Sequence, residues 1–157
     1  MDDGTTAAVY KKALNNDKTH VGLFALRNIS EGEVIVSEVA KCGQVKPHKY
    51  TIQRIPVVAD SIQNVVDGST CDNQTTSQQK DQTPLHLEMD ESLLMRYINH
   101  SFQPNAVIEF HVNELHRVTL RAITHIREDA EVCFNYRSTE SQLAEPFVDL
   151  GSGRKVH

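Results

Sequence analysis

Short apolar segments alternate with polar turns along most of this 157-residue chain. The apolar segments are rich in Val, Ile, Leu and Phe, which fit the pleated, half-buried surface of a strand. Asn, Asp and Gly in the intervening turns tolerate tight backbone conformations. The pattern therefore predicts a mostly β protein with almost no helix. The predicted strands are residues 9–14, 34–39, 50–53, 57–59, 85–89, 106–111, 116–122 and 131–136, and residues 19–25 are predicted to be a loop that runs into a further apolar strand.

The pattern also predicts how some of these segments are connected. Residues 9–14 are as compatible with a helical turn as with a strand, because Ala and Lys surround their apolar positions. A helical turn is expected to begin at residues 90–92, with Asp90 as its N-cap. Residues 106–111 and 116–122 are predicted to form a hairpin over the turn 112–115.

One segment of the chain is echoed later in the sequence. Residues 25–34 resemble residues 122–132 once a single additional residue is allowed. Each copy reads as a strand, a polar turn and a second strand. Many short strands joined by tight turns are typical of an all-β or β-dominated domain.

The length of the chain favours a single domain that spans residues 1–157. Residues 67–84 are almost wholly polar and cannot supply a core face, so they are predicted to be a surface insertion. Residues 137–157 are interpreted as a C-terminal tail. No apolar run is long enough to span a membrane, and the first residues do not resemble a signal peptide. We therefore expect an intracellular protein, nuclear or cytoplasmic.

Charge and metal-binding residues exclude some functions. The formal net charge of −5 argues against non-specific nucleic-acid binding. It would suit a basic peptide partner, but from charge alone simple solubility is the preferred explanation. The three cysteines are widely spaced, which argues against a disulfide framework or a zinc knuckle and favours reduced thiols. His111 and His116 flank the predicted hairpin turn without a third ligand, so no metal site is predicted.

A polar stretch at residues 96–105 separates two apolar segments. It contains Asn99 and His100 side by side, followed by Pro104 and Asn105. Asn and His each offer hydrogen-bond donors and acceptors, and can hold a polar ligand from a half-buried position. The alternative is a turn whose polar pair only ties loops together.

This stretch resembles part of the signature of the SET-domain lysine methyltransferases. Its partner in that signature is the run Glu131 to Tyr136, about thirty residues later. Residues 20–25, with residues 29–34 behind them, resemble the first motif of the family. The resemblance covers roughly residues 9–136 and leaves out the polar insertion.

The resemblance implies a fold of small curved sheets with a C-terminal pseudoknot, which brings the Asn-His-Ser stretch against the Phe-x-Tyr element. It also implies S-adenosylmethionine as cofactor and a protein lysine as methyl acceptor, with a histone tail as a possible substrate. Tyr136 would lie beside the reacting methyl and amine. Because a free phenol titrates near ~10, we expect it to orient and stabilise rather than act as a general base. In isolation, Tyr136 would be read as a core aromatic.

The remaining site residues are also assigned by the resemblance. Asn99 and His100 would hold the cofactor, and Arg96 would be its neighbour unless it forms only a surface ion pair. Tyr97 is equally compatible with a place near the adenine or in the core. Backbone groups in the first motif would meet the methionine end of the cofactor, with a glycine allowing close approach. The residues of that motif are His20, Val21 and Gly22.

The chain departs from the family pattern in its last part. No cysteine follows Tyr136, whereas many members have a cysteine-rich zinc segment there. Residues 144–147 either replace that segment, with Phe147 over the adenine or the channel mouth, or form a loose tail. Asp129-Ala130 stands where the family commonly has Gly-Glu, and Asn135 replaces an Asp.

Phe134 would line the lysine channel with Tyr136. In this family a Phe there leaves room for more than one methyl group, so methylation beyond the monomethyl state is expected. A catalytically inactive SET-like module that binds a peptide or partner is the alternative. The departures at His20, where the family often has Gly, and at Asp129-Ala130, together with the missing zinc segment, keep that alternative open. The presence of Tyr136, Asn99 and His100 argues against it. A histidine-based metal-binding protein is a third and weaker interpretation.

Overall fold

The computed structural model describes residues 7–16, 18–42, 50–54, 85–139, 147–148 and 152–156. Strands predominate in these ranges, with a little 3-10 helix, as the sequence predicted. No helix in this part of the chain is long and apolar enough to cross a membrane. The elements are β1 (Val9–Ala13), β2 (Val21–Ala25), β3 (Val34–Val39), β4 (Lys41–Cys42), β5 (Thr51–Arg54), β6 (Leu85–Glu88), η1 (Leu94–Tyr97), β7 (Asn99–His100), β8 (Ala106–His111), β9 (Glu114–Ala122), β10 (Glu131–Phe134), η2 (Tyr136–Ser138), β11 (Phe147–Val148) and β12 (Lys155–Val156).

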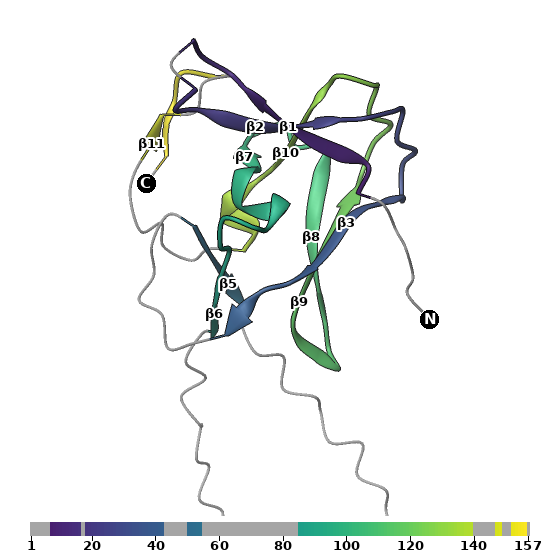
Figure 1. Ribbon diagram of the computed structural model, residues 1–157, viewed down its shortest axis with the longest axis vertical. Coiled ribbons are helices and arrows are strands. Elements are labelled where there is room, and N and C mark those ends of the chain that lie inside the picture. Colours follow the sequence, from purple (N-terminus) through teal and green to yellow (C-terminus); the bar gives the residue numbers. More distant parts are fainter. Residues whose placement is uncertain are drawn as a thin grey trace, which may run out of the picture.

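The strands form several small sheets (Figure 1). The strand order is β1-β2-β10-β7 in the first sheet, β3-β9-β8 in the second and β4-β6-β5 in the third. β11 pairs with β12. The predicted strand 57–59 and the predicted insertion 67–84 lie outside the described residues.

One hydrophobic core joins the three larger sheets. Leu23 in β2, Leu120 in β9 and Leu87 in β6 have no exposed surface, and Met95 of η1 packs with them. In β6 the alternation predicted from the sequence is confirmed, because Leu87 and Met89 are buried and their neighbours are half-buried. The core therefore fixes η1, and with it the chain that enters β7.

The two echoed segments lie side by side. The N–H of Ile29 donates to the carbonyl of Ile126 at 2.8 Å, and the N–H of Ile126 donates back at 2.9 Å. The same relation continues outward on both sides, with bonds from Ala25 to Ala130 and from Ala122 to Glu33, each 2.9 Å long. The repeat in the sequence thus corresponds to an approximate two-fold pairing of strand-turn-strand units.

The second of these turns places a non-glycine residue in the left-handed region. Asp129 has φ 62°, a conformation that Gly adopts without steric cost. A Gly, which the resemblance led us to expect at this position, would adopt this conformation without strain. The hydroxyl of Tyr10 donates to the Asp129 carboxylate, and this bond raises the pKa of Tyr10 above its ordinary value.

The helical turn near residue 90 differs from the prediction. Asp90 does not cap η1; its carboxylate instead accepts from the N–H and hydroxyl of Ser92 within the preceding turn. The cap comes from β3, where the two carboxylate oxygens of Glu38 accept from the N–H groups of Leu94 at 2.7 Å and Met95 at 3.0 Å. A remote side chain therefore satisfies the donors that a local N-cap would satisfy.

The predicted hairpin is present with a tighter turn than expected. β8 and β9 are antiparallel, and β9 begins at Glu114 rather than at His116. Arg54, only 4% exposed, donates to carbonyls of this hairpin at His111 and Leu115, 2.7 and 2.9 Å away. Its guanidinium also lies 5.4 Å from the centre of the Phe110 ring. Arg54 thereby ties the β4-β6-β5 sheet to the hairpin.

Candidate active site

The two halves of the predicted site pair as neighbouring strands. β7 and β10 run parallel, with Cys133 opposite Asn99 and Phe134 opposite His100. The N–H of Ser101 donates to the carbonyl of Phe134 at 3.0 Å. On its other edge β10 pairs with β2. The juxtaposition of the Asn-His-Ser stretch with the Phe-x-Tyr element, expected from the resemblance, is present in the structure.

Asn105 holds β10 against the loop that follows β7. Its side-chain amide donates to the carbonyl of Glu131 at 2.8 Å, and its side-chain oxygen accepts from the N–H of Cys133 at 2.9 Å. Its backbone N–H also donates to the carbonyl of Cys133 at 3.2 Å. The side chain therefore forms hydrogen bonds to the backbone of β10, as the backbone of a neighbouring strand would. This role was not predicted from the sequence.

The sequence predicted a strand that ends at Tyr136, but in the structure Tyr136 lies beyond the end of the strand. β10 stops at Phe134, and Tyr136 begins the 3-10 turn η2. The side chain of Asn135 accepts from the N–H of Arg137 at 3.1 Å, which turns the chain out of the sheet. The phenol of Tyr136 then donates to the carbonyl of Ile98 at 2.7 Å.

His100 fixes the backbone of Tyr136 from the opposite strand. Its Nδ1 accepts from the N–H of Tyr136 at 3.1 Å, which requires a neutral ring whose proton is on Nε2. The imidazole is only 7% exposed and meets the Phe102 ring edge-on, with the ring centres 4.6 Å apart. The Tyr136 ring is 5.3 Å from His100 and 4.9 Å from Phe134. These aromatic rings form one continuous cluster.

Asn99 is held by two acceptors. Its Nδ2 donates to the Glu131 carboxylate at 2.8 Å and lies 3.4 Å from the carbonyl of Val21. β10 pairs with Leu23 and Phe24 but not with Val21, so at Val21 the edge of β2 faces Asn99 instead. From the sequence, Glu131 was predicted only to lie in a strand. The signal in the sequence for its contact with Asn99 was an acidic residue at the start of the run Glu131 to Tyr136.

Gly22 lies against the same two side chains. A Cβ added there would lie 2.7 Å from Oε1 of Glu131 and 3.1 Å from Nδ2 of Asn99. The glycine is therefore needed for packing inside the protein. The predicted close approach of a ligand to its backbone stays a prediction.

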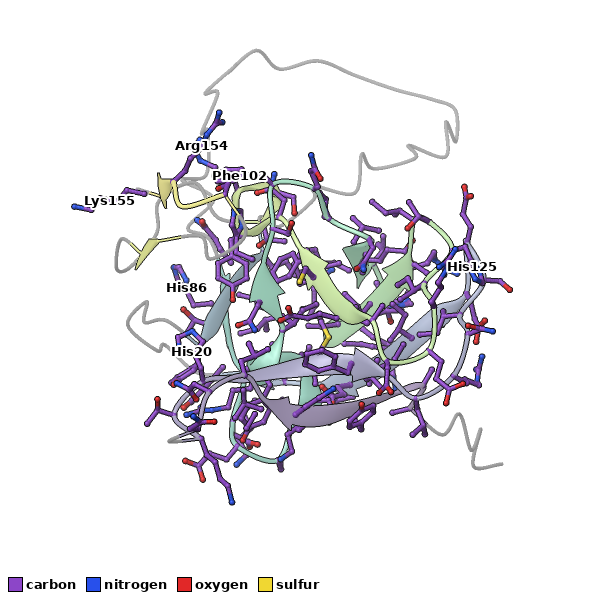
Figure 2. The ribbon with its side chains drawn as sticks, turned by 90° about the horizontal axis from the view of Figure 1, so that it is seen from above. His20, His86, Phe102, His125, Arg154 and Lys155 are labelled. Carbon is purple, nitrogen blue, oxygen red and sulfur yellow. The ribbon has the colours of Figure 1, made fainter. Side chains whose placement is uncertain are left out.

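His20 is exposed, and its backbone groups serve the β1–β2 hairpin. Its N–H donates to the side chain of Asn15 at 3.1 Å, and its carbonyl accepts from the N–H of Leu14 at 2.8 Å. His20 lies on the same side of the molecule as Phe102, whereas His125 lies on the other side (Figure 2). Of the first-motif residues, Val21 is the one whose backbone faces Asn99.

The side chains of Arg96 and Tyr97 have partners away from Asn99. The Arg96 guanidinium donates to the carbonyl of Met89 at 3.0 Å and stacks 3.6 Å from the centre of the Tyr50 ring. Tyr97 packs against the core, with the ammonium of Lys11 4.5 Å from the centre of its ring. Packing against the core is thus observed for Tyr97, and a place near the adenine stays a prediction. Phe147 lies in β11, and its side chain is not among those that the structure describes. Its place over the adenine or the channel mouth therefore stays a prediction.

The sequence matches the family model of the SET domain over residues 20–137. The chain belongs to the SET-domain family. No curated protein matches the sequence.

Solved structures with the same fold include histone methyltransferases. A candidate histone methyltransferase from Plasmodium falciparum matches this SET-domain chain with a TM-score of 0.50 and 19% identity, over 83% of this chain and 94% of that chain. The methyltransferase domain of human PR domain-containing protein 2 matches with a TM-score of 0.53 and 14% identity, over 90% and 84%. At these identities the likeness establishes the fold.

A further match is to Polycomb Repressive Complex 2 of Chaetomium thermophilum, in an autoinhibited conformation bound to S-adenosylmethionine. The TM-score is 0.52 and the identity 17%, over 98% of this SET-domain chain. The match covers only 20% of the other chain.

Proposed function

We propose that this SET-domain protein is an S-adenosylmethionine-dependent protein-lysine methyltransferase. The observation that carries the proposal is the placement of Tyr136. His100 and Ile98, both in the first half of the paired motif, bind its backbone N–H and its phenol. The functional unit is inferred to be one domain with its core at residues 9–136. The acceptor is a lysine of a protein or peptide, with a histone tail as the first substrate to test.

The residues around Asn99 fit the amino-acid end of S-adenosylmethionine, which carries an ammonium and a carboxylate. Since the carbonyl of Val21 points toward Asn99, the N–H of the same strand residue points to that edge as well. Because Nδ2 of Asn99 is bound within the protein, its Oδ1 is the atom left to accept from a ligand. The edge therefore offers a donor for a carboxylate and an acceptor for an ammonium.

When bound, S-adenosylmethionine supplies an electrophilic methyl group on a sulfonium centre. The contribution of Tyr136 is to orient the acceptor amine. Its phenolic proton is donated to Ile98, so the oxygen can accept a hydrogen bond from the amine. A free lysine has a pKa near ~10.4 and must lose a proton before it can attack. The apolar surface of Phe134, 3% exposed, disfavours the charged ammonium nearby.

Methyl transfer from radiolabelled S-adenosylmethionine to core histones and to total cell extract tests the proposal. We expect labelled protein with the wild type and at least about a tenfold loss with Tyr136→Phe, because the phenol both orients the amine and binds Ile98. Labelling that is unchanged by Tyr136→Phe would contradict the role of this residue.

The alternative is a catalytically inactive SET-like module that binds a peptide. The contacts of His20 and Arg96 favour it, since groups expected to reach the cofactor have partners elsewhere. Isothermal titration calorimetry separates the two functions. A protein that does not bind S-adenosylmethionine but binds histone peptides is the binding module.

The product is proposed to extend beyond monomethyl-lysine. Phe134 has no hydroxyl that could hold a water beside the amine, so the space is left for additional methyl groups. Phe134→Tyr is expected to shift the product distribution toward the monomethyl form, as measured by mass spectrometry of a methylated peptide. Monomethyl product alone from the wild type would show that the proposed product state is wrong.

A further inference from the structure

We propose that Glu131 is a positioning residue, which sets the orientation of the Asn99 side-chain amide. The orientation leaves Oδ1 of Asn99 as an acceptor for the ammonium of an amino-acid ligand, and this consequence rests on the proposed function. Glu131 itself is assigned no contact with the ligand.

The hydrogen-bond partners of Asn99 fix the direction of its side-chain amide. The oxygen and nitrogen of an Asn side chain are distinguished by their hydrogen-bond partners. The carboxylate of Glu131 and the carbonyl of Val21 are both acceptors, and both face the same atom of Asn99. That atom must be the NH2 group, since an oxygen there would meet two other oxygens without a proton between them.

Glu131 is the stronger of the two acceptors. Its oxygen lies 2.8 Å from Nδ2, against 3.4 Å for the carbonyl of Val21, and a carboxylate forms a stronger hydrogen bond than a neutral group. Among the described residues, no Lys or Arg forms an ion pair with Glu131, so no cation draws the carboxylate away from the amide. The orientation of Asn99 therefore depends chiefly on Glu131.

Glu131 is itself held in place from two directions. Asn105 donates to its backbone carbonyl at 2.8 Å, and Phe24 is its partner across the pair of β2 and β10. Its carboxylate lies over Gly22, where a Cβ would be only 2.7 Å away. These contacts restrict both the backbone and the side chain, as a positioning residue requires.

The orientation of the Asn99 amide determines whether the site accepts the ammonium or the carboxylate of a ligand. With Nδ2 bound inside the protein, Asn99 presents Oδ1 outward. An ammonium can donate to that oxygen, whereas a carboxylate at the same place would be repelled. In the flipped orientation the preference would be reversed, so Glu131 decides which end of a zwitterionic ligand lies beside Asn99.

The role can be measured first in the ligand-free protein. We expect the side-chain NH2 protons of Asn99 to exchange slowly with solvent in NMR spectra of the wild type. Glu131→Ala is expected to accelerate that exchange, while Glu131→Gln retains an acceptor oxygen and keeps it slow. Glu31→Ala is the matched control, because it removes an exposed carboxylate from a distant turn. Exchange that is the same in Glu131→Ala and the wild type overturns the proposal.

The consequence for binding is measured by calorimetry with two ligands. S-Adenosylhomocysteine keeps the amino-acid end, and 5′-methylthioadenosine lacks it. We expect Glu131→Ala to weaken binding of the first by about 10- to 100-fold and to leave the second within about twofold. Glu131→Gln is expected to restore most of the affinity for S-adenosylhomocysteine.

The outcomes separate this inference from the proposed function. If Glu131→Ala loses the same affinity for both ligands, the pocket is damaged as a whole and the positioning role is overturned. The role is also overturned if Glu131→Gln binds S-adenosylhomocysteine no better than Glu131→Ala does. If the wild type binds neither ligand, the proposed cofactor is wrong. In that case the exchange of the Asn99 amide still decides whether Glu131 positions it.

Discussion

Gly22 has too little space beside it for any side chain. Its neighbours are the Glu131 carboxylate and the Asn99 amide, both within 3.1 Å of where a Cβ would lie. The 2.7 Å distance to Oε1 of Glu131 is shorter than real Cβ contacts, so a larger residue must displace that carboxylate, while the 3.1 Å distance to Nδ2 of Asn99 is tight. The absence of a side chain at Gly22 thus leaves room for the Glu131 carboxylate and the Asn99 amide in their observed positions.

Gly22→Ala is expected to lower the free energy of unfolding by about 1–3 kcal/mol, because the added methyl displaces Glu131 from Asn99. It should also weaken binding of S-adenosylhomocysteine in the same direction as Glu131→Ala. Urea denaturation and calorimetry measure the two effects.

Gly32→Ala is the matched control for this substitution. Gly32 has φ 81° and open space around it, so alanine there costs about 1–2 kcal/mol of backbone strain without a steric clash. Ligand binding should be unaffected. A Gly22→Ala protein that binds the ligand as well as Gly32→Ala does would contradict the packing explanation.

At the scale of elements, η1 is positioned by a side chain from another sheet. Glu38 of β3 caps the turn through Leu94 and Met95, and η1 leads directly into β7. A second link joins β4 to the turn that follows β6, through an ion pair of 2.8 Å between Lys41 and Asp90. Both links hold the segment that carries Asn99.

Glu38→Ala is expected to destabilise the protein by about 1–2 kcal/mol, since two N–H donors at the start of η1 lose their acceptor. Hydrogen exchange should increase at Leu94 and Met95 in particular. The control is Glu31→Ala, which removes an exposed carboxylate and is expected to change stability by less than about 0.5 kcal/mol. Equal exchange in the two variants would contradict the capping role.

The Lys41–Asp90 pair predicts a pH dependence. Lys41 and two bonds from Ser92 lower the pKa of Asp90, and Asp90 raises the pKa of Lys41. The stabilisation from Asp90 is therefore present above its ordinary pKa of 3.8 and is lost as the pH falls through the lowered value. That from Lys41 is present below 10.5 and is lost as the pH rises through the raised value.

Lys41→Met is accordingly expected to be less stable than the wild type at neutral pH, by an amount that shrinks below pH 3.8 and in high salt. Urea denaturation of both proteins over this pH range measures the difference. A difference that does not vary with pH or salt would show that the ion pair is not its cause.

At the scale of the whole molecule, single strands and side chains connect sheets that are separate in the sequence. β10 lies between β2 and β7, and Arg54 joins β5 to the β8–β9 hairpin. Arg54 is buried, whereas Leu115, one of the residues whose carbonyls it binds, is 54% exposed. Loss of the guanidinium would therefore remove charge-assisted hydrogen bonds between the sheet and the hairpin.

Arg54→Met keeps much of the side-chain volume and removes the donors. We expect it to lower the free energy of unfolding by about 1.5–3 kcal/mol and to increase hydrogen exchange at the tip of the β8–β9 hairpin. Arg117→Met, at a more exposed ion pair with Glu114, is the control and should cost less than about 1 kcal/mol. Equal losses for the two variants would contradict the role of Arg54.

The sequence by itself determined where the longer strands lie and which two motifs pair. Alternation of apolar residues located β6, and the repeat around Ile29 and Ile126 corresponds to an actual pairing. The paired motif placed Asn99 and His100 beside Phe134. These features are local or repeated patterns, and a pattern of that kind is visible without knowledge of distant contacts.

Only the tertiary structure decided which atoms of those segments are available. The cap of η1 comes from Glu38, the Arg96 side chain turns to Tyr50, and the Asn99 amide is bound by Glu131. Each of these contacts joins residues far apart in the sequence, and no local preference specifies them. The physical reason is that a polar side chain takes the partners that folding places around it, because burial without them is costly.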